Sequence, residues 1–144
     1  MIKTGLTSVT FRHLSCDEII QIVALNGLDF IEWGGDVHCP PGQFEKARNI
    51  ARKTTEAGLG ISSYGSYYTV DDSMETCSDF EDVLETAVAM QAPVIRVWAG
   101  NKNYEDSDHL YIQKIAEQSR LIADKSLGMG IKLAFEFHKN TLTN

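Results

Sequence analysis

The chain has 144 residues and a mass of 16.0 kDa, with 43% hydrophobic and 23% charged residues. This balance is that of one globular domain with its own core, and it excludes a disordered chain. The net charge of -7 excludes nucleic acid as a main partner, because nothing offsets the repulsion between an acidic protein and a phosphate backbone.

The N-terminal stretch MIKTGLTSVTFRHL has no apolar signal-peptide region, and no apolar run reaches membrane-spanning length. Cys16, Cys39 and Cys77 are odd in number and widely spaced, which indicates free thiols in a reducing compartment. His38 precedes Cys39, but adjacent strand residues point to opposite faces, so a shared His-Cys site is disfavoured. We therefore expect a cytoplasmic protein with no membrane partner.

The predicted elements alternate between strands and helices along the whole chain. The first helix begins with a capping box, Ser15 with Glu18, and ends at Asn26-Gly27, while Ser78 and Glu81 repeat the box before the third helix. In chain order, we expect a strand within 2–11, helix 15–27, strand 28–33, helix 43–58, strand 60–68, helix 78–92, strand 93–100, helix 107–130 and strand 131–137.

Strict alternation of this kind predicts an α/β fold with parallel strands and right-handed crossovers. Two architectures share the pattern. A doubly wound sheet of five strands needs about this length. A (β/α)8 barrel needs about 250 residues, of which this chain would be just over half. Length alone favours the doubly wound sheet.

The polar side chains within the strands favour the barrel. Alternation puts Glu32, Arg96 and Glu136 on one face of their strands, opposite apolar neighbours. A doubly wound sheet covers both faces with helices, so its central strands should be almost wholly apolar. We therefore predict a single partial (β/α) barrel domain over residues 1–144, truncated after the fifth strand, with the doubly wound sheet as the alternative.

Candidate site residues lie at the C-terminal ends of the predicted strands, where barrels carry their active sites. Glu32 and Arg96 are expected to face each other as a structural pair. Glu136 has no basic neighbour expected at its own level, which leaves a divalent cation as its natural partner. His38 and His138 are each more typical of structural histidines when taken singly, and Tyr64 lies in SYGSYY, a stretch suited to hydrogen-bonding a polyol.

Four motifs, IEWGGDVHCPPG, AGLGISSYGSYY, APVIRVWAG and LAFEFHKNTLT, resemble in order and spacing the sugar phosphate isomerase/epimerase family with its xylose-isomerase-like TIM barrel. The resemblance implies proton transfer between neighbouring carbons of a small sugar or cyclitol, through an ene-diolate, with Mn, Zn, Mg or Co as cofactor. It implies that Glu136 is the catalytic and metal-binding residue and that His38, Trp98 and His138 are pocket residues that contact the substrate. Tyr64 and Arg96 are further candidate substrate contacts, from their own positions at the strand ends.

The chain departs from the family pattern because strands six to eight, with their metal ligands and second catalytic acid, are absent. We therefore expect no activity from the chain alone, and self-association, most simply as a homodimer that covers unpaired strand edges. Alternatives are a keto-cyclitol (inosose-type) dehydratase and a non-catalytic α/β module that oligomerises. Four His and the negative charge argue against an endonuclease IV-like DNA repair enzyme.

Overall fold

The computed structural model describes residues 2–71 and 76–144, and the side chains of 2–71 and 80–144. Five parallel strands form one sheet in the order β1-β2-β3-β4-β5. The strands are β1 (Gly5–Thr7), β2 (Phe30–Gly34), β3 (Gly60–Val70), β4 (Val94–Ala99) and β5 (Lys132–Phe135). This sequential order is that of a TIM barrel, and it excludes the 2-1-3-4-5 order of the doubly wound alternative. The sheet is open within the described residues.

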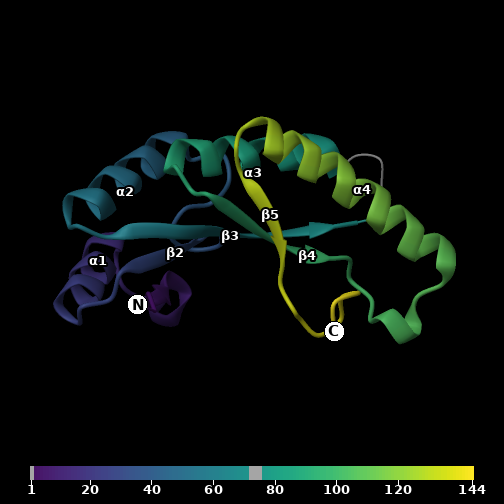
Figure 1. Cartoon of the computed structure of the whole chain (residues 1–144), viewed down its shortest axis with the longest axis horizontal. Helices are drawn as coiled ribbons and strands as arrows, with labels where there is room; N and C mark the ends of the chain where they lie inside the picture. Colours follow the sequence, from purple (N-terminus) through teal and green to yellow (C-terminus); the bar gives the residue numbers. More distant parts are fainter. Residues whose placement is uncertain (1, 72–75) are drawn as a thin grey trace.

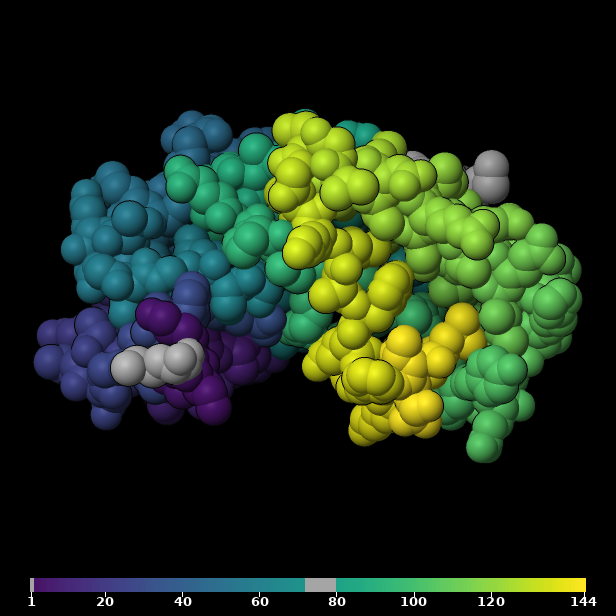
Figure 2. Space-filling view, in the orientation of Figure 1, coloured from purple at the N-terminus to yellow at the C-terminus, as the bar shows by residue number. Residues whose placement is uncertain are grey.

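Four α-helices follow the strands in turn: α1 (Cys16–Leu25), α2 (Phe44–Glu56), α3 (Thr76–Met90) and α4 (His109–Gly128). Figure 1 shows α2, α3 and α4 arching over one side of the sheet, with the C-terminal segment on the other side. In Figure 2 the N-terminal residues and the C-terminal segment lie on either side of a gap in the lower outline. The chain therefore has a convex helical side and a concave side.

The core lies between the sheet and the helices. Fully buried side chains from the strands, such as Ile31, Ile95 and Val97, pack with those of the helices, such as Ile19 and Ile122. Burial of this apolar surface is the main source of stability for such a layer. No helix in residues 2–71 or 76–144 is long and apolar enough to cross a bilayer.

The first helix starts and ends where the sequence predicts. Ser15 and Glu18 form both bonds of the capping box, and Gly27 follows the helix with a φ of 67°. The third helix begins at Thr76, two residues before the predicted cap Ser78, whose side chain lies outside the described ones.

The first and last strands are shorter than predicted. After Thr7 the chain forms a 3-10 turn, η1 (Ser8–Phe11), and the Ser8 hydroxyl accepts a 2.9 Å bond from the Gly34 amide. The last strand ends before Glu136, although the Glu136 amide still bonds to the Val97 carbonyl at 3.1 Å. Phe137 lies beyond the strand, where the alternation of side chains no longer applies, and is 88% exposed.

A bulge in β3 changes its register against β4. Gly65 lies beside Arg96, whereas Tyr68 lies beside Val97, so Ser66 and Tyr67 are two extra residues in β3. The Ser66 hydroxyl donates to the Arg96 carbonyl at 2.8 Å and stabilises the bulge. Tyr67 has a φ of 60°, in the left-handed region that few non-glycine residues adopt. Such bulges re-aim a side chain.

Candidate functional site

Polar side chains of the first three strands meet on the concave side of the sheet. The parallel register sets Thr7 beside Glu32 and Glu32 beside Ser63. Glu32 accepts hydrogen bonds from the hydroxyls of both neighbours, at 3.2 Å from Thr7 and 2.6 Å from Ser63. These bonds fix the Glu32 carboxylate and direct it toward β4.

Arg96 on β4 forms ion pairs with two carboxylates at once. Its Nε lies 3.3 Å from Glu32 Oε1, and its Nη1 donates to Glu136 Oε2. The expected pairing of Glu32 with Arg96 is confirmed. The expectation that Glu136 has no basic neighbour is wrong: Arg96 lies beside Ala134 in the register, and its long side chain reaches the residue that follows β5.

Glu136 has one oxygen that is bonded twice and one that is not bonded. Trp98 Nε1 donates to Oε2 at 2.6 Å, the same oxygen that Arg96 contacts. No hydrogen bond or ion pair reaches Oε1 from the described residues. The Glu136 side chain is 35% exposed, so a ligand on the concave side can reach its carboxylate.

Three aromatic rings stand beside Glu136. The His138 ring stacks on the Trp98 ring with centroids 4.6 Å apart. The Tyr67 ring packs edge-on against Trp98, with 5.4 Å between the ring centroids. His138 Nδ1 donates to the Lys139 carbonyl at 2.8 Å, so in the neutral ring Nε2 is a hydrogen-bond acceptor. An aromatic surface with one acceptor suits the apolar and hydroxyl groups of a sugar.

Arg12, in the turn between η1 and α1, completes the opposite side of the site. It forms an ion pair with Asp36 and donates a 2.8 Å bond to the Tyr67 hydroxyl. The resulting cleft has a volume of about 430 Å³. Nine residues line the cleft. They come from β1 to β4 and from the segments that follow β1 and β5, namely Thr7, Val9, Arg12, Glu32, Tyr67, Arg96, Trp98, Glu136 and His138.

The cleft brings together four of the six predicted site residues. His38 and Tyr64 are not in its lining, because both are buried. His38 is bonded at both ring nitrogens, to the Ser8 hydroxyl at 3.0 Å and the Leu14 carbonyl at 3.2 Å, and burial lowers its pKa. The Tyr64 hydroxyl donates to the Cys39 carbonyl at 2.8 Å, and burial raises the pKa of Tyr64.

Sequence reasoning missed Tyr67 and Arg12. SYGSYY marks a tyrosine-rich strand end, but only the bulge decides that Tyr67, and not Tyr64, borders the cleft. Arg12 lies between the predicted first strand and first helix, where nothing in the local pattern indicates its bond to Tyr67. Cys39 is buried, and burial raises the pKa of its thiol to about 11, which makes it a poor nucleophile or metal ligand.

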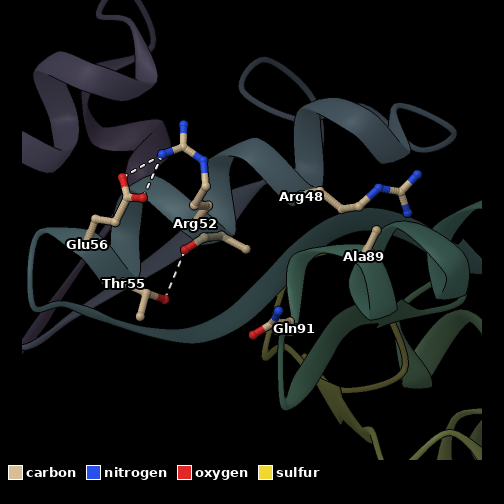
Figure 3. A pocket seen from close by; sticks show the side chains of 7 residues that line it. Arg48, Arg52, Thr55, Glu56, Ala89 and Gln91 are labelled. Carbon is tan, nitrogen blue, oxygen red and sulfur yellow. Dashed lines mark hydrogen bonds and ion pairs between the residues drawn. The ribbon is translucent and has the colours of Figure 1, made fainter.

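A second hollow, of about 450 Å³, lies on the helical side between α2 and α3. Figure 3 shows its Arg52 turned onto Glu56 of the same helix, with Arg48 extending toward α3. Arg48 is in turn paired with Glu45. Because both arginines are paired on an exposed surface, this hollow offers less chemistry than the concave cleft.

The residues that the structure describes contain no group of three or more His, Cys, Asp or Glu arranged to hold a metal ion. Glu136 by itself fits a divalent cation, because carboxylate oxygen is a suitable ligand and Oε1 is unbonded within the described chain. Glu32 fits less well, since Thr7, Ser63 and Arg96 already bond to its oxygens. Among the described residues, Glu136 is therefore the carboxylate of this cleft best suited to hold a metal ion.

Comparison with known proteins finds one family model and many solved structures that resemble the chain. A family model described as xylose isomerase-like TIM barrel matches residues 20–144. No curated protein sequence matches significantly. Among solved structures, the probable 3-DHS dehydratase AsbF from Bacillus anthracis has a TM-score of 0.82 and 24% identity, over 99% of this chain and 54% of that one.

Two further structures show the same fold. The IOLI protein with a zinc atom has a TM-score of 0.79 and 14% identity, over 99% of this chain and 55% of its own. D-psicose 3-epimerase in the presence of D-fructose has a TM-score of 0.66 and 18% identity, over 92% and 51%. The chain therefore spans about half the length of these structures.

Proposed function

Because the chain belongs to the family of xylose isomerase-like TIM barrels, we propose that it is part of a sugar or sugar-phosphate isomerase or epimerase. Such an enzyme moves a proton between neighbouring carbons through an ene-diolate. The observation that carries the proposal is Glu136, a carboxylate with one bonded and one unbonded oxygen at the end of β5. D-psicose 3-epimerase, which shares the fold, supports the substrate class.

In the proposed site, Glu136 holds a divalent cation through Oε1. A bound cation would polarise the substrate oxygens beside the reacting carbon. The zinc atom in the IOLI structure supports the use of a metal. The cation would need further ligands besides Glu136.

The substrate would lie against the aromatic side chains of the cleft. Trp98 and Tyr67 offer apolar ring surface to the carbon-hydrogen face of a sugar. His138 Nε2 can accept a hydrogen bond from a substrate hydroxyl, since Nδ1 is the donor to Lys139. Glu32 is not proposed as the acid or base, because three donors already hold it.

One carboxylate cannot act on both faces of the reacting carbon, so a second acid-base group is required. We propose Glu136 as the catalytic residue of this chain because it would hold the cation that polarises the substrate. The complete reaction is a property of the whole active site, to which the described residues contribute one side.

Epimerase or isomerase activity tests the proposal directly. The test uses the whole active site, that is, this chain together with the second acid-base group that the proposal requires: it is incubated with ketoses and their phosphates and Mn²⁺ in deuterated water, and exchange of the carbon-bound proton is followed by NMR. We expect Glu136→Gln to lower exchange by at least about 100-fold, a typical effect for an acid-base residue. Glu45→Gln, at a 90% exposed side chain on α2, is the matched control. Exchange that survives in Glu136→Gln contradicts the proposal.

A keto-cyclitol dehydratase is the second candidate. The observation that favours it is the similarity to AsbF over 99% of the chain. At 24% identity this is a similarity of fold. Dehydration also begins with removal of a proton beside a carbonyl, so it would use the same cleft. Formation of an enone, followed by its ultraviolet absorbance, distinguishes dehydration from epimerisation.

A further inference from the structure

Arg96 connects two acids that come from opposite parts of the sheet. It contacts Glu32 of β2 through Nε and Glu136, beyond β5, through Nη1. We infer that Arg96 is a positioning residue: it fixes Oε2 of Glu136 and thereby turns Oε1 toward the cleft. The inference rests on the proposed function, in which Oε1 is the oxygen that takes part in the reaction.

The two donors to Glu136 come from one strand. Arg96 and Trp98 are two residues apart on β4, so their side chains leave the same face. Both bond to Oε2, and neither bonds to Oε1. A carboxylate held by one oxygen has its other oxygen in a defined direction, as bonded carboxylates around metal sites do.

Glu32 explains how Arg96 can bond to Glu136 and still leave a negative charge at the site. Arg96 carries one positive charge and contacts two negative ones, so the three side chains together keep one negative charge. Because Arg96 and Glu32 are only 17% and 21% exposed, solvent screens their interaction less than at the surface. The remaining negative charge is available to a divalent ion.

Gly65 gives the guanidinium the room to lie across the sheet. A Cβ atom at this position would stand 2.7 Å from Arg96 Nη2 and 3.3 Å from Glu32 Oε1. A side chain at this position would require the Arg96 guanidinium to shift. The bridge therefore depends on a glycine of β3, the strand between its two ends.

The indole N–H of Trp98 reports the position of Glu136 without any metal or substrate. The chain has two tryptophans, and Trp33 Nε1 is buried with no hydrogen-bond partner among the described residues. The two indole signals in a proton-nitrogen NMR spectrum therefore separate a carboxylate-bonded N–H from an unbonded one. We expect Arg96→Met to move the Trp98 signal and leave the Trp33 signal in place.

Three further variants make this test specific. Glu136→Gln shows where the Trp98 signal lies when the carboxylate is lost, and Arg48→Met removes a surface arginine as a control. Gly65→Ala displaces Arg96 without removing it, and should move the Trp98 signal in the same direction as Arg96→Met. An unchanged Trp98 signal in a folded Arg96→Met variant, with Trp33 unmoved, overturns the inference. If Arg96→Met does not fold, Gly65→Ala decides in the same way.

Binding of Mn²⁺ alone, followed by electron paramagnetic resonance, gives a second readout. Loss of a residue that orients a metal ligand typically lowers affinity by about 10- to 100-fold, and we expect this of Arg96→Met. Equal or tighter binding in Arg96→Met would show that the arginine competes with the ion and would contradict the inference. If Glu136→Gln binds Mn²⁺ as tightly as the wild-type protein does, the proposed function is contradicted. The indole signals still decide the role of Arg96 in that case.

Discussion

The Ser8 hydroxyl and the His38 ring form a buried hydrogen bond, with 3.0 Å between Oγ and Nδ1. His38 Nε2 faces the Leu14 carbonyl at 3.2 Å, so Nε2 carries the proton and Nδ1 accepts from Ser8. The Ser8 oxygen in turn accepts from the Gly34 amide. These bonds anchor the turn after β1 to the end of β2, and they require a neutral histidine.

The first prediction is that acid weakens the fold through His38. Burial lowers the folded-state pKa of His38 below the ordinary value of 6.5, so the unfolded chain binds the proton more readily. This contribution to stability is present above pH 6.5 and is lost as the pH falls from there through the folded-state pKa. Urea unfolding at several pH values should show the decline, and His38→Gln should flatten it. An equal slope in His38→Gln would contradict the prediction.

The second prediction compares two glycines with left-handed backbones. Gly100 has a φ of 77°, and an added Cβ would stand 2.4 Å from the Tyr111 hydroxyl. Gly58 has a φ of 76° with open space around it. Gly58→Ala should cost only the backbone term, about 1–2 kcal/mol, whereas Gly100→Ala should cost more because Tyr111 must also move. Free energies of unfolding measure both, and equal costs would refute the role of Tyr111.

The third prediction concerns the reactivity of Cys39. Its pKa of about 11 leaves little thiolate at pH 8, and its side chain is inaccessible. Alkylation by iodoacetamide in the folded protein should be slower than in urea by on the order of 100-fold or more. Mass mapping of the labelled peptides distinguishes Cys39 from the other cysteines. Rapid labelling of native Cys39 would mean that the segment after β2 opens readily.

The fourth prediction is the self-association expected from the sequence. β1 and β5 are the outer strands of the described sheet, and edge strands offer unpaired amides and carbonyls to another chain. Phe135 and Phe137 add exposed apolar surface near β5. Sedimentation velocity at micromolar concentration should show a dimer, and Phe137→Glu should weaken it.

Leu25→Glu provides the control for that experiment. Leu25 is 78% exposed on α1, which packs against β2 at the end of the sheet away from β5, so a charge there should leave a dimer formed near β5 unchanged. A compact monomer in the wild-type protein would contradict the prediction. An equal effect of both variants would point to a general loss of solubility, not to an interface near β5.

The alternation of strands and helices could be predicted from the sequence, because caps and apolar periodicity are local signals. Ser15 and Glu18 are an example, since both cap bonds form within one turn of the chain. The common face of Glu32, Arg96 and Glu136 was also predictable. Side chains alternate regularly along the strands as far as Arg96, and the chain after β5 stays paired with β4 through the Glu136 amide.

The details of the site could not be predicted, because they depend on distances between strands. The contact of Arg96 with Glu136 requires the β4–β5 register together with the reach of an arginine, and neither is a local property. The position of Tyr67 depends on a bulge that Ser66 stabilises through a bond to another strand. Local sequence pattern gave no sign that Tyr67 would line the cleft in place of Tyr64.

The sequential order of the strands also bears on how the protein is made. Each strand from β2 to β5 pairs with the strand synthesised just before it, so one of its partners is already present when it emerges. Each of these pairings joins strands that are neighbours in the sequence, although a parallel crossover closes a longer loop than a hairpin does. A nascent chain could therefore add one strand and helix at a time as it leaves the ribosome, at a pace set by translation. Glu136 would be the last of the bridged side chains to emerge, and Arg96 and Glu32 would already be in place to receive it.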